Sequence, residues 1–175
     1  RGCQHGGEVV RGGEGQCLGG AQQGHGLPGA LGHRRIVLYA LRMNSIFVFV
    51  ADYHEPGQAR AIVELLDAYA RDPAGGGTPL SAYARENLVA ALAARPQAFS
   101  ILALDGEQPV GLINCIEGFA TFACRPLVNI HDVVVRRSHR GQRVGERMLA
   151  EAERVARARG ACKLTLEVLS GNAPA

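Results

Sequence analysis

Residues 127–149 read LVNIHDVVVRRSHRGQRVGERML, and this stretch decides the fold. Its first nine residues are rich in Val and Ile, which favours a half-buried β-strand. A basic loop with one glycine follows, and from Val144 to Ala156 apolar residues recur at helical spacing. Gly160 stands where a left-handed residue would end such a helix. The pattern therefore predicts a strand, a loop and a helix in succession.

The loop of this unit is suited to binding an anion. The first N–H groups of a helix have no partner within the helix, and the helix dipole adds partial positive charge there. Arginine can bind phosphate oxygens in a fork, and the loop carries Arg136, Arg137, Arg140 and Arg143. The sequence thus predicts a phosphate or pyrophosphate site. The alternative is a solvated basic crossover in an ordinary α/β domain.

Residues 140–145, RGQRVG, resemble the [Q/R]xxGx[G/A] motif of the GNAT family of N-acetyltransferases, which binds the pyrophosphate of acetyl-CoA. Neither a Walker loop nor a GxGxxG motif is present. Arg143 stands where the family most often has glycine, and a positive φ would cost arginine more than glycine. The cofactor-binding residues that the resemblance implies here are Arg140, Gly141, Gln142, Arg143, Val144 and Gly145.

The resemblance covers roughly residues 46–175 and implies the fold. It predicts an α+β or α/β domain with a mixed, mostly antiparallel central sheet, a parallel β-loop-α-β cofactor unit and helices on both faces. It also implies that the pantetheine arm runs along Val133, Val134 and Val135, whose N–H groups would meet the oxyanion. Asn172 matches a family asparagine that contacts this arm, although a helix N-cap is an equal alternative.

Two carboxylates compete for the role of general base toward an amine. Asp132 lies on the central strand just before the loop and is the first choice. Glu117 lies at the end of the preceding strand and is the second choice. A structural carboxylate that pins a neighbouring loop remains an alternative for Asp132. His131 is expected to be packed or partly exposed on the opposite sheet face, His139 to lie near the phosphates, and no metal site is predicted.

The remaining elements follow from periodicity and turn signals. Asp105-Gly106 predicts a tight hairpin turn, and residues 118–126 read as a loop. Thr78 is the expected N-cap of the second helix. The sequence predicts strands at residues 46–51, 98–104, 109–116 and 162–169, and helices beginning at Pro56 and Pro79.

The two ends of the chain differ in composition from the rest. Residues 1–42 hold roughly half of the 23 glycines and show little periodicity, so a disordered or non-native extension is expected before an acetyltransferase domain at residues 43–175. Met43 is the hypothesised natural start. In the resembled family, a sequence like GNAPA at residues 171–175 opens a further helix, which predicts that the C-terminal part of the domain is missing.

The expected function is an acetyl-CoA-dependent N-acetyltransferase acting on a small-molecule or peptide amine. A non-catalytic acyl-CoA-binding or sensing module is the alternative. The formal charge of +3 is mild and the arginines are local, which disfavours a nucleic-acid partner, and no uninterrupted apolar run predicts a membrane span. The five cysteines lack metal-ligand spacing and favour a reducing cytoplasm, with Cys115 and Cys162 buried. The resemblance leaves a homodimer open.

Overall fold

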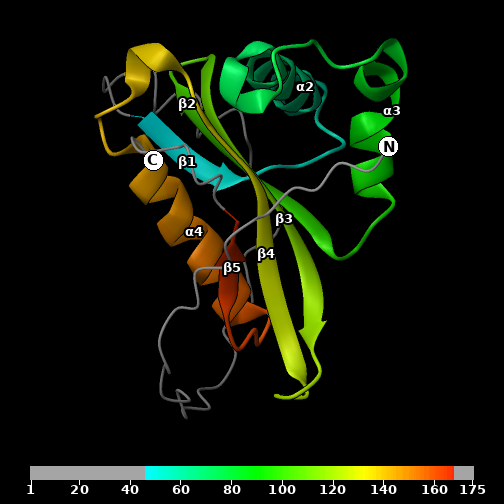
Figure 1. The fold of residues 1–175 in the computed structure, drawn as a ribbon. Helices are drawn as coiled ribbons and strands as arrows, with labels where there is room; N and C mark the ends of the chain where they lie inside the picture. Colours follow the sequence, from blue (N-terminus) through cyan, green and yellow to red (C-terminus); the bar gives the residue numbers. More distant parts are fainter. Residues whose placement is uncertain (1–45, 168–175) are drawn as a thin grey trace.

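A computed structural model describes residues 46–167, which form a five-stranded sheet in the order β1-β2-β3-β4-β5. Figure 1 shows α2 and α3 on one side of this sheet and α4 on the other. The predicted extension at residues 1–42, Met43 and Asn172 lie outside the described residues. The strands are β1 (Ile46–Val50), β2 (Ala98–Asp105), β3 (Gln108–Ala120), β4 (Arg125–Val135) and β5 (Leu164–Leu166). The helices are α2 (Pro56–Arg71), α3 (Ala82–Ala93) and α4 (Val144–Ala158), with short 3-10 turns at η1 (Pro73–Gly75) and η2 (Arg137–His139).

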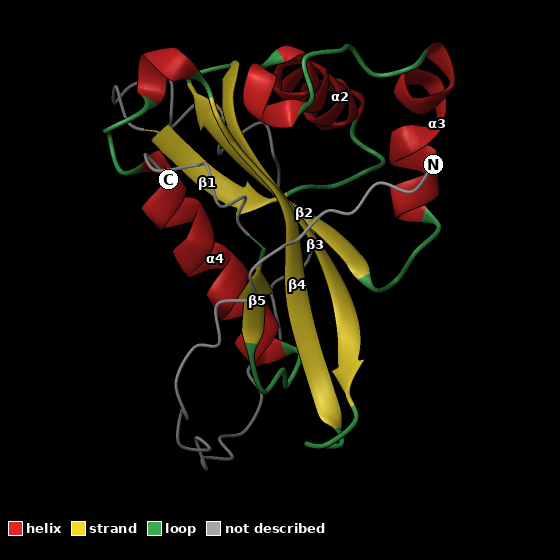
Figure 2. Cartoon of the chain, in the orientation of Figure 1, coloured by secondary structure: helices red, strands yellow, loops and turns green. Residues whose placement is uncertain are grey.

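The sheet combines two kinds of strand pairing, as predicted. Strands β1 to β4 pair antiparallel in chain order, and β4 pairs parallel with β5 after the crossover through α4. Figure 2 shows α4 and β5 beside the long β3–β4 hairpin. The α4 helix ends at Gly160 with φ 74°, where the Ala161 N–H donates to the Ala156 carbonyl at 3.0 Å. The mixed, mostly antiparallel sheet with helices on both faces is thereby confirmed.

Each face of the sheet carries its own apolar core. On one face α4 contributes Val144, Met148, Ala152 and Ala156 to a cluster with residues of β2, β3 and β4. On the other face α2 contributes Ala61, Ile62 and Leu65 to a second cluster, against which α3 packs with Leu88, Val89 and Leu92. Burial of both helix faces against one sheet explains why the apolar periodicity of these segments was readable in the sequence.

A β-bulge in β4 shifts which side chains face each core. Asn114 pairs with Asp132, whereas the next residue of β3, Cys115, pairs with Ile130, so His131 is the extra residue. Val128 and Ile130 join the α4-side cluster before the bulge, and Val134 joins the α2-side cluster after it. The side chain of His131 is exposed, so of the two environments expected for it, packed or partly exposed, the packed one is not found. Strict alternation along β4 therefore holds only on each side of His131.

Several predicted boundaries are wrong. The loop expected at residues 118–126 is mostly strand, because the hairpin stays in register out to the pair Ala120 and Arg125. Helix α3 starts at Ala82 rather than Pro79, because Ser81 supplies the cap by accepting a hydrogen bond from the Ala84 N–H at 3.1 Å.

The last strand also differs from its prediction. Strand β5 begins at Leu164, two residues after the predicted start, so Cys162 precedes the strand and is exposed instead of buried. Residues 168 and 169 of the predicted strand lie outside the described residues. Cys115 is buried in β3, as expected.

Candidate active site

The loop between β4 and α4 presents an open helix N-terminus. Gly141 and Arg143 both have positive φ, at 74° and 59°, which turns the chain sharply into α4. Arg143 occupies the N-cap position but its side chain makes no capping hydrogen bond. Among the described residues, the N–H groups of Val144 and Gly145 at the start of α4 donate no hydrogen bond to a backbone carbonyl. Going along the chain, the first N–H of α4 that does so is that of Arg147, which donates to the Arg143 carbonyl. Unpaired amides of this kind are suited to binding an anion.

The loop arginines differ in how strongly the fold engages them. Arg137 donates to Asp72 at 3.0 Å, and Arg140 lies 3.9 Å from the same carboxylate. Arg140 also donates from Nε to the Val135 carbonyl at 3.2 Å, which holds it beside the end of β4. Arg143 is 81% exposed and only loosely paired with Glu146 at 3.9 Å. These cations remain accessible to a bound diphosphate, because most of their side-chain surface faces solvent.

The fold also holds the two flanks of the loop in place. Arg136 donates to the Pro109 carbonyl at 2.6 Å and pairs with Glu64 of α2. His139 lies 3.3 Å from Asp105 in the β2–β3 turn, so the loop is tied to both neighbouring elements.

Within residues 46–167, no strand pairs with one edge of β4 where β4 approaches the loop. Among the described residues β5 pairs with β4 only from Val128 to Ile130. Beyond the bulge, Arg136 donates its N–H to Val110 of β3 at 2.8 Å. Because N–H directions alternate along a strand, the N–H groups of Val133 and Val135 point to the opposite, open edge. The third residue of this predicted set, Val134, turns its N–H toward β3 and its side chain toward the α2-side core.

The two candidate carboxylates lie on opposite faces of the sheet. Asp132 shares the α2-side face with Val134 and accepts a hydrogen bond at Oδ2 from Asn114 at 2.9 Å. Glu117 pairs with Arg159 at 3.3 Å, and the Arg159 guanidinium stacks 4.6 Å above the Phe99 ring in the α4-side core. The structure therefore does not bring the two together, and it occupies Glu117 in an ion pair.

Sequence reasoning missed the partners of Asp132. Asn114 and Ser100 are buried, and Ser100 donates to Asn114 Oδ1 at 2.7 Å. The sequence feature that could have identified Ser100 and Asn114 is a polar residue inside each of two apolar predicted strands, at residues 98–104 and 109–116. The missing information was the register, since only the bulge at His131 brings Asp132 opposite Asn114.

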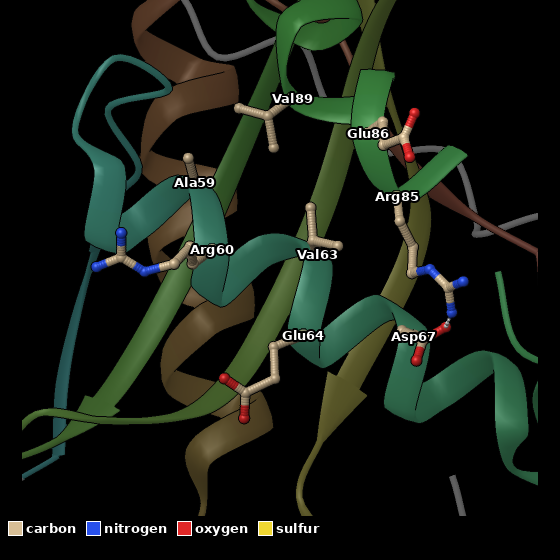
Figure 3. A pocket seen from close by; sticks show the side chains of 8 residues that line it. All are labelled: Ala59, Arg60, Val63, Glu64, Asp67, Arg85, Glu86 and Val89. Atoms are coloured by element: carbon tan, nitrogen blue, oxygen red, sulfur yellow. Dashed lines mark ion pairs between the residues drawn. The ribbon is translucent and has the colours of Figure 1, made fainter. Parts of the chain in front are cut away.

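A groove of about 480 Å³ lies between α2 and α3, away from these residues (Figure 3). One of its acidic side chains, Asp67, stabilises the fold. Asp67 accepts from the Leu80 N–H at 2.8 Å and lies 3.8 Å from Arg85, the pair marked in Figure 3. These contacts lower the pKa of Asp67, with the Arg71 hydrogen bond as the largest cause. The groove thus lies at the junction of α2 and α3, which the ion pair of Asp67 and Arg85 connects.

Residues 46–167 contain neither a membrane-spanning helix nor a metal-binding cluster. No helix there is long and apolar enough to cross a bilayer. No three side chains of His, Cys, Asp or Glu in that part of the chain gather closely enough to hold a metal ion.

The arrangement of the free strand edge, the left-handed loop and the open helix coincides with a known family pattern. The model of the acetyltransferase (GNAT) family matches residues 59–175, two thirds of the chain. The chain belongs to the GNAT acetyltransferase family. No curated protein sequence matches it.

Solved structures share the GNAT fold with this acetyltransferase at low sequence identity. A ribosomal-protein-alanine N-acetyltransferase from Brucella melitensis biovar Abortus 2308 superimposes with a TM-score of 0.61 at 15% identity, covering 73% of this chain and 85% of that chain. An aminoglycoside acetyltransferase from an uncultured soil metagenomic sample, in complex with sisomicin, gives a TM-score of 0.63 at 14% identity, covering 74% and 81%. A GNAT family acetyltransferase from Staphylococcus aureus gives 0.61 at 16% identity, covering 74% and 90%.

Proposed function

We propose that this protein is an N-acetyltransferase that binds acetyl-CoA at the β4–α4 unit and transfers the acetyl group to a primary amine. One observation carries the proposal: the open edge of β4 leads directly to the open N-terminus of α4. A diphosphate needs the helix terminus, and a thioester arm with two amides needs a strand edge. The two requirements meet at one loop, in the order in which acetyl-CoA presents these groups.

The diphosphate would lie against the amides of residues 141–145. Gly141 and Arg143 have left-handed backbone conformations, which occur in loops whose successive amides bind anions. Arg140 and Arg143 would add charge, and the side chains of Gln142 and Val144 matter less there than the backbone. Gly145 leaves space at this point, since a Cβ at this position would meet nothing closer than Val135 Cγ2 at 4.0 Å.

The thioester arm would pair with the open edge of β4. The N–H groups of Val133 and Val135 are the donors available to it, and one of them would stabilise the oxyanion of the tetrahedral intermediate. The Val135 carbonyl already accepts from Arg140, so a substrate amide would compete for it or use the Val133 carbonyl. Asn172 remains a proposed contact of this arm from the sequence match alone.

The reaction needs the acceptor as a free amine. Asp132 would accept the proton of the ammonium form, directly or through one water. The amine nitrogen then forms a bond to the thioester carbon, the C–S bond breaks, and the departing thiolate takes up the second proton, which the attacking nitrogen loses as it becomes the amide. We prefer Asp132 to Glu117, because Glu117 is paired with Arg159 on the far face of the sheet.

Turnover with a panel of amines tests this function. The panel contains simple alkyl amines, a peptide with N-terminal alanine and an aminoglycoside, the last two chosen from the printed names of two structural neighbours. We expect acetylated product by mass spectrometry and stoichiometric release of the CoA thiol. Asp132→Asn should lower kcat about 100-fold or more, whereas Glu117→Gln should retain most of it.

The same assay distinguishes the alternative function. An acyl-CoA-binding or sensing module would bind acetyl-CoA and release no thiol with any amine of the panel. Equal activity of Asp132→Asn and the parent would remove Asp132 from the proposal. A cytoplasmic location is proposed with this function, because Cys115, Cys124 and Cys162 are free thiols.

A further inference from the structure

A row of polar side chains crosses the α2-side face of the sheet. Ser100 of β2 pairs in register with Asn114 of β3, and Asn114 pairs with Asp132 of β4. Tyr53, from the loop after β1, stands at the other end. Ser100 is fully buried and Asn114 is 6% exposed. These four residues, called the polar row here, break an otherwise apolar layer, so their hydrogen bonds must offset a large cost of desolvation.

The polar row has one consistent direction. Asn114 donates from Nδ2 to Asp132 Oδ2 at 2.9 Å, and Ser100 donates its only proton to Asn114 Oδ1 at 2.7 Å. The hydroxyl groups of Tyr53 and Ser100 are 2.9 Å apart. Since the Ser100 proton is already used, Tyr53 is the donor of that bond. Burial raises the pKa of Tyr53 above its usual value, which keeps this proton in place. Every donor in the row thus points toward Asp132.

The hydroxyl groups determine which end of the Asn114 amide faces the carboxylate. If the amide turned over, Oδ1 would face Asp132 Oδ2, and an ionised carboxylate can only accept. The Ser100 hydroxyl opposes that turn by donating to Oδ1, and Tyr53 opposes the turn of Ser100 in the same way. An amide nitrogen does not relay protons as a hydroxyl or water does, so the row fixes an orientation and is no proton wire.

The polar row also leaves one carboxylate oxygen of Asp132 available. Within residues 46–167, Oδ1 receives no hydrogen bond, and Asp132 is partly exposed. The Asp132 position is next to Val133, whose N–H points to the open edge of β4. Oδ2 of Asp132 therefore binds Asn114 within the sheet, whereas Oδ1 is available to a group outside the sheet.

We infer that Tyr53, Ser100 and Asn114 are positioning residues that hold the Asp132 carboxylate with its second oxygen toward the acceptor amine. This inference rests on the proposed function, in which Asp132 receives the proton. This role would explain why polar residues are buried at these positions, which packing alone does not explain. It also predicts that the hydroxyl at residue 100 matters for turnover although it lies two strands from the reaction.

The first arm of the test needs no activity. In a 15N-labelled protein, the side-chain amide of Asn114 should give a distinct NMR signal with slow hydrogen exchange, assigned through its loss in Asn114→Leu. Ser100→Val should shift this signal and speed its exchange, whereas Ser100→Thr should preserve it. Val and Thr have nearly the same shape, so the pair isolates the hydroxyl. An unchanged Asn114 signal in Ser100→Val would overturn the inference.

The second arm measures steady-state kinetics with an amine that the parent acetylates. We expect Ser100→Val to lower kcat about 10- to 100-fold relative to Ser100→Thr, since small misplacements of a reacting group cost this much. The KM for acetyl-CoA should stay within about twofold, because the loop does not contact the polar row. Tyr53→Phe keeps the aromatic ring and should lower kcat by a smaller factor. This variant replaces Ser100→Val in the test if Ser100→Val does not fold.

A double variant shows whether the effect acts through Asp132. In the Asp132→Asn background, Ser100→Val should lower kcat no further, as expected when both changes remove the same interaction. Additive losses, or equal kcat for Ser100→Val and Ser100→Thr, would overturn the inference while leaving the acetyltransferase function intact. Absence of turnover by the parent would overturn the catalytic role and the proposed function together, with the NMR arm still reporting whether the row exists.

Discussion

At the scale of the residue, the loop between β4 and α4 contains a strained position. Arg143 has φ 59° and ψ 21°, a left-handed conformation that glycine adopts without the steric cost of a Cβ. The sequence indicated this position through its departure from the family motif. We predict that Arg143→Gly stabilises the protein by about 0.5–1 kcal/mol, because relief of strain exceeds the added entropy of the unfolded chain. Thermal unfolding should show a rise in Tm of about 1–4 °C.

The control for this prediction is Arg143→Ala. Alanine removes the same charge and side chain but keeps the Cβ, so its Tm should stay near or below that of the parent. An equal gain for alanine and glycine would mean that removal of positive charge from the loop, and not backbone strain, is responsible.

A second residue-scale prediction concerns cysteine reactivity. Burial raises the pKa of Cys115 to about 12, and the side chain is 1% exposed, while Cys124 and Cys162 are exposed. Because the thiolate is the reactive form, iodoacetamide at pH 8 should label Cys124 and Cys162 and spare Cys115 in the folded protein. Peptide mapping by mass spectrometry checks this, with a sample in guanidinium as the control in which Cys115 is labelled. Rapid labelling of Cys115 under native conditions would contradict the burial of β3.

The residues that the sequence could not place are those that depend on register. Alternation along residues 127–135 puts Ile130 and Asp132 on one face, yet they lie on opposite faces because His131 is an extra residue. No local property of the sequence at His131 predicts a β-bulge. The alignment of Asp132 with Asn114 and Ser100 could therefore not be predicted, whereas the loop motif could, because its chemistry is local.

At the scale of the element, the sequence predicted which helices and strands are present better than where each of them begins and ends. The strands, the hairpin turn at Asp105 and both ends of α4 follow from periodicity and from turn and cap residues. The α3 start was wrong because Thr78 and Ser81 are both suitable caps, and the hydrogen bond from the Leu80 N–H to Asp67, 13 residues earlier, favours the later one. The extent of the β3–β4 hairpin was wrong because Gly118 and Pro126, the two residues that bound the expected loop, both pair across the strands.

The bulge in β4 gives an element-scale prediction. The pairing of β5 with β4 ends at Ile130, and His131 follows at once. Deletion of His131 would restore regular alternation and keep Ile130 opposite Cys115 and Asp132 opposite Asn114. The protein should therefore fold, but a straighter β4 would leave less room beside β5. We expect acetyl-CoA affinity to fall about tenfold or more, since bulges next to sites direct the strand away from its neighbour.

Isothermal titration calorimetry with acetyl-CoA measures this effect. His131→Ala is the matched control, because it removes the side chain and keeps the extra backbone residue, and it should bind like the parent. Parent-like affinity of the deletion variant, with cooperative unfolding retained, would show that the bulge does not shape the site.

At the scale of the whole molecule, the sheet separates two tasks. The α4 face holds the loop, and the α2 face holds Asp132 and the polar row. Two ion pairs connect the loop to the α2 side of the sheet, Arg136 to Glu64 of α2 and Arg137 to Asp72 directly after α2. The family and the fold class were predictable because the loop motif and its flanking elements are contiguous in sequence. The acceptor side depends on distant segments and was not predictable.

The most direct test of the central claim is a thermal-shift titration of the full chain with acetyl-CoA, comparing the parent with Gly145→Glu and Gly145→Gln. Residue 145 is the second of α4, where a glutamate is compatible with the helix dipole but repels a diphosphate. At 100 times the dissociation constant the ligand should add about 2.7 kcal/mol of stability to the parent. We predict a clear shift for the parent, a smaller shift for Gly145→Gln, whose side chain fills part of the space for the diphosphate, and no shift for Gly145→Glu, which adds a negative charge. Equal shifts in all three, or none in the folded parent, would contradict the account.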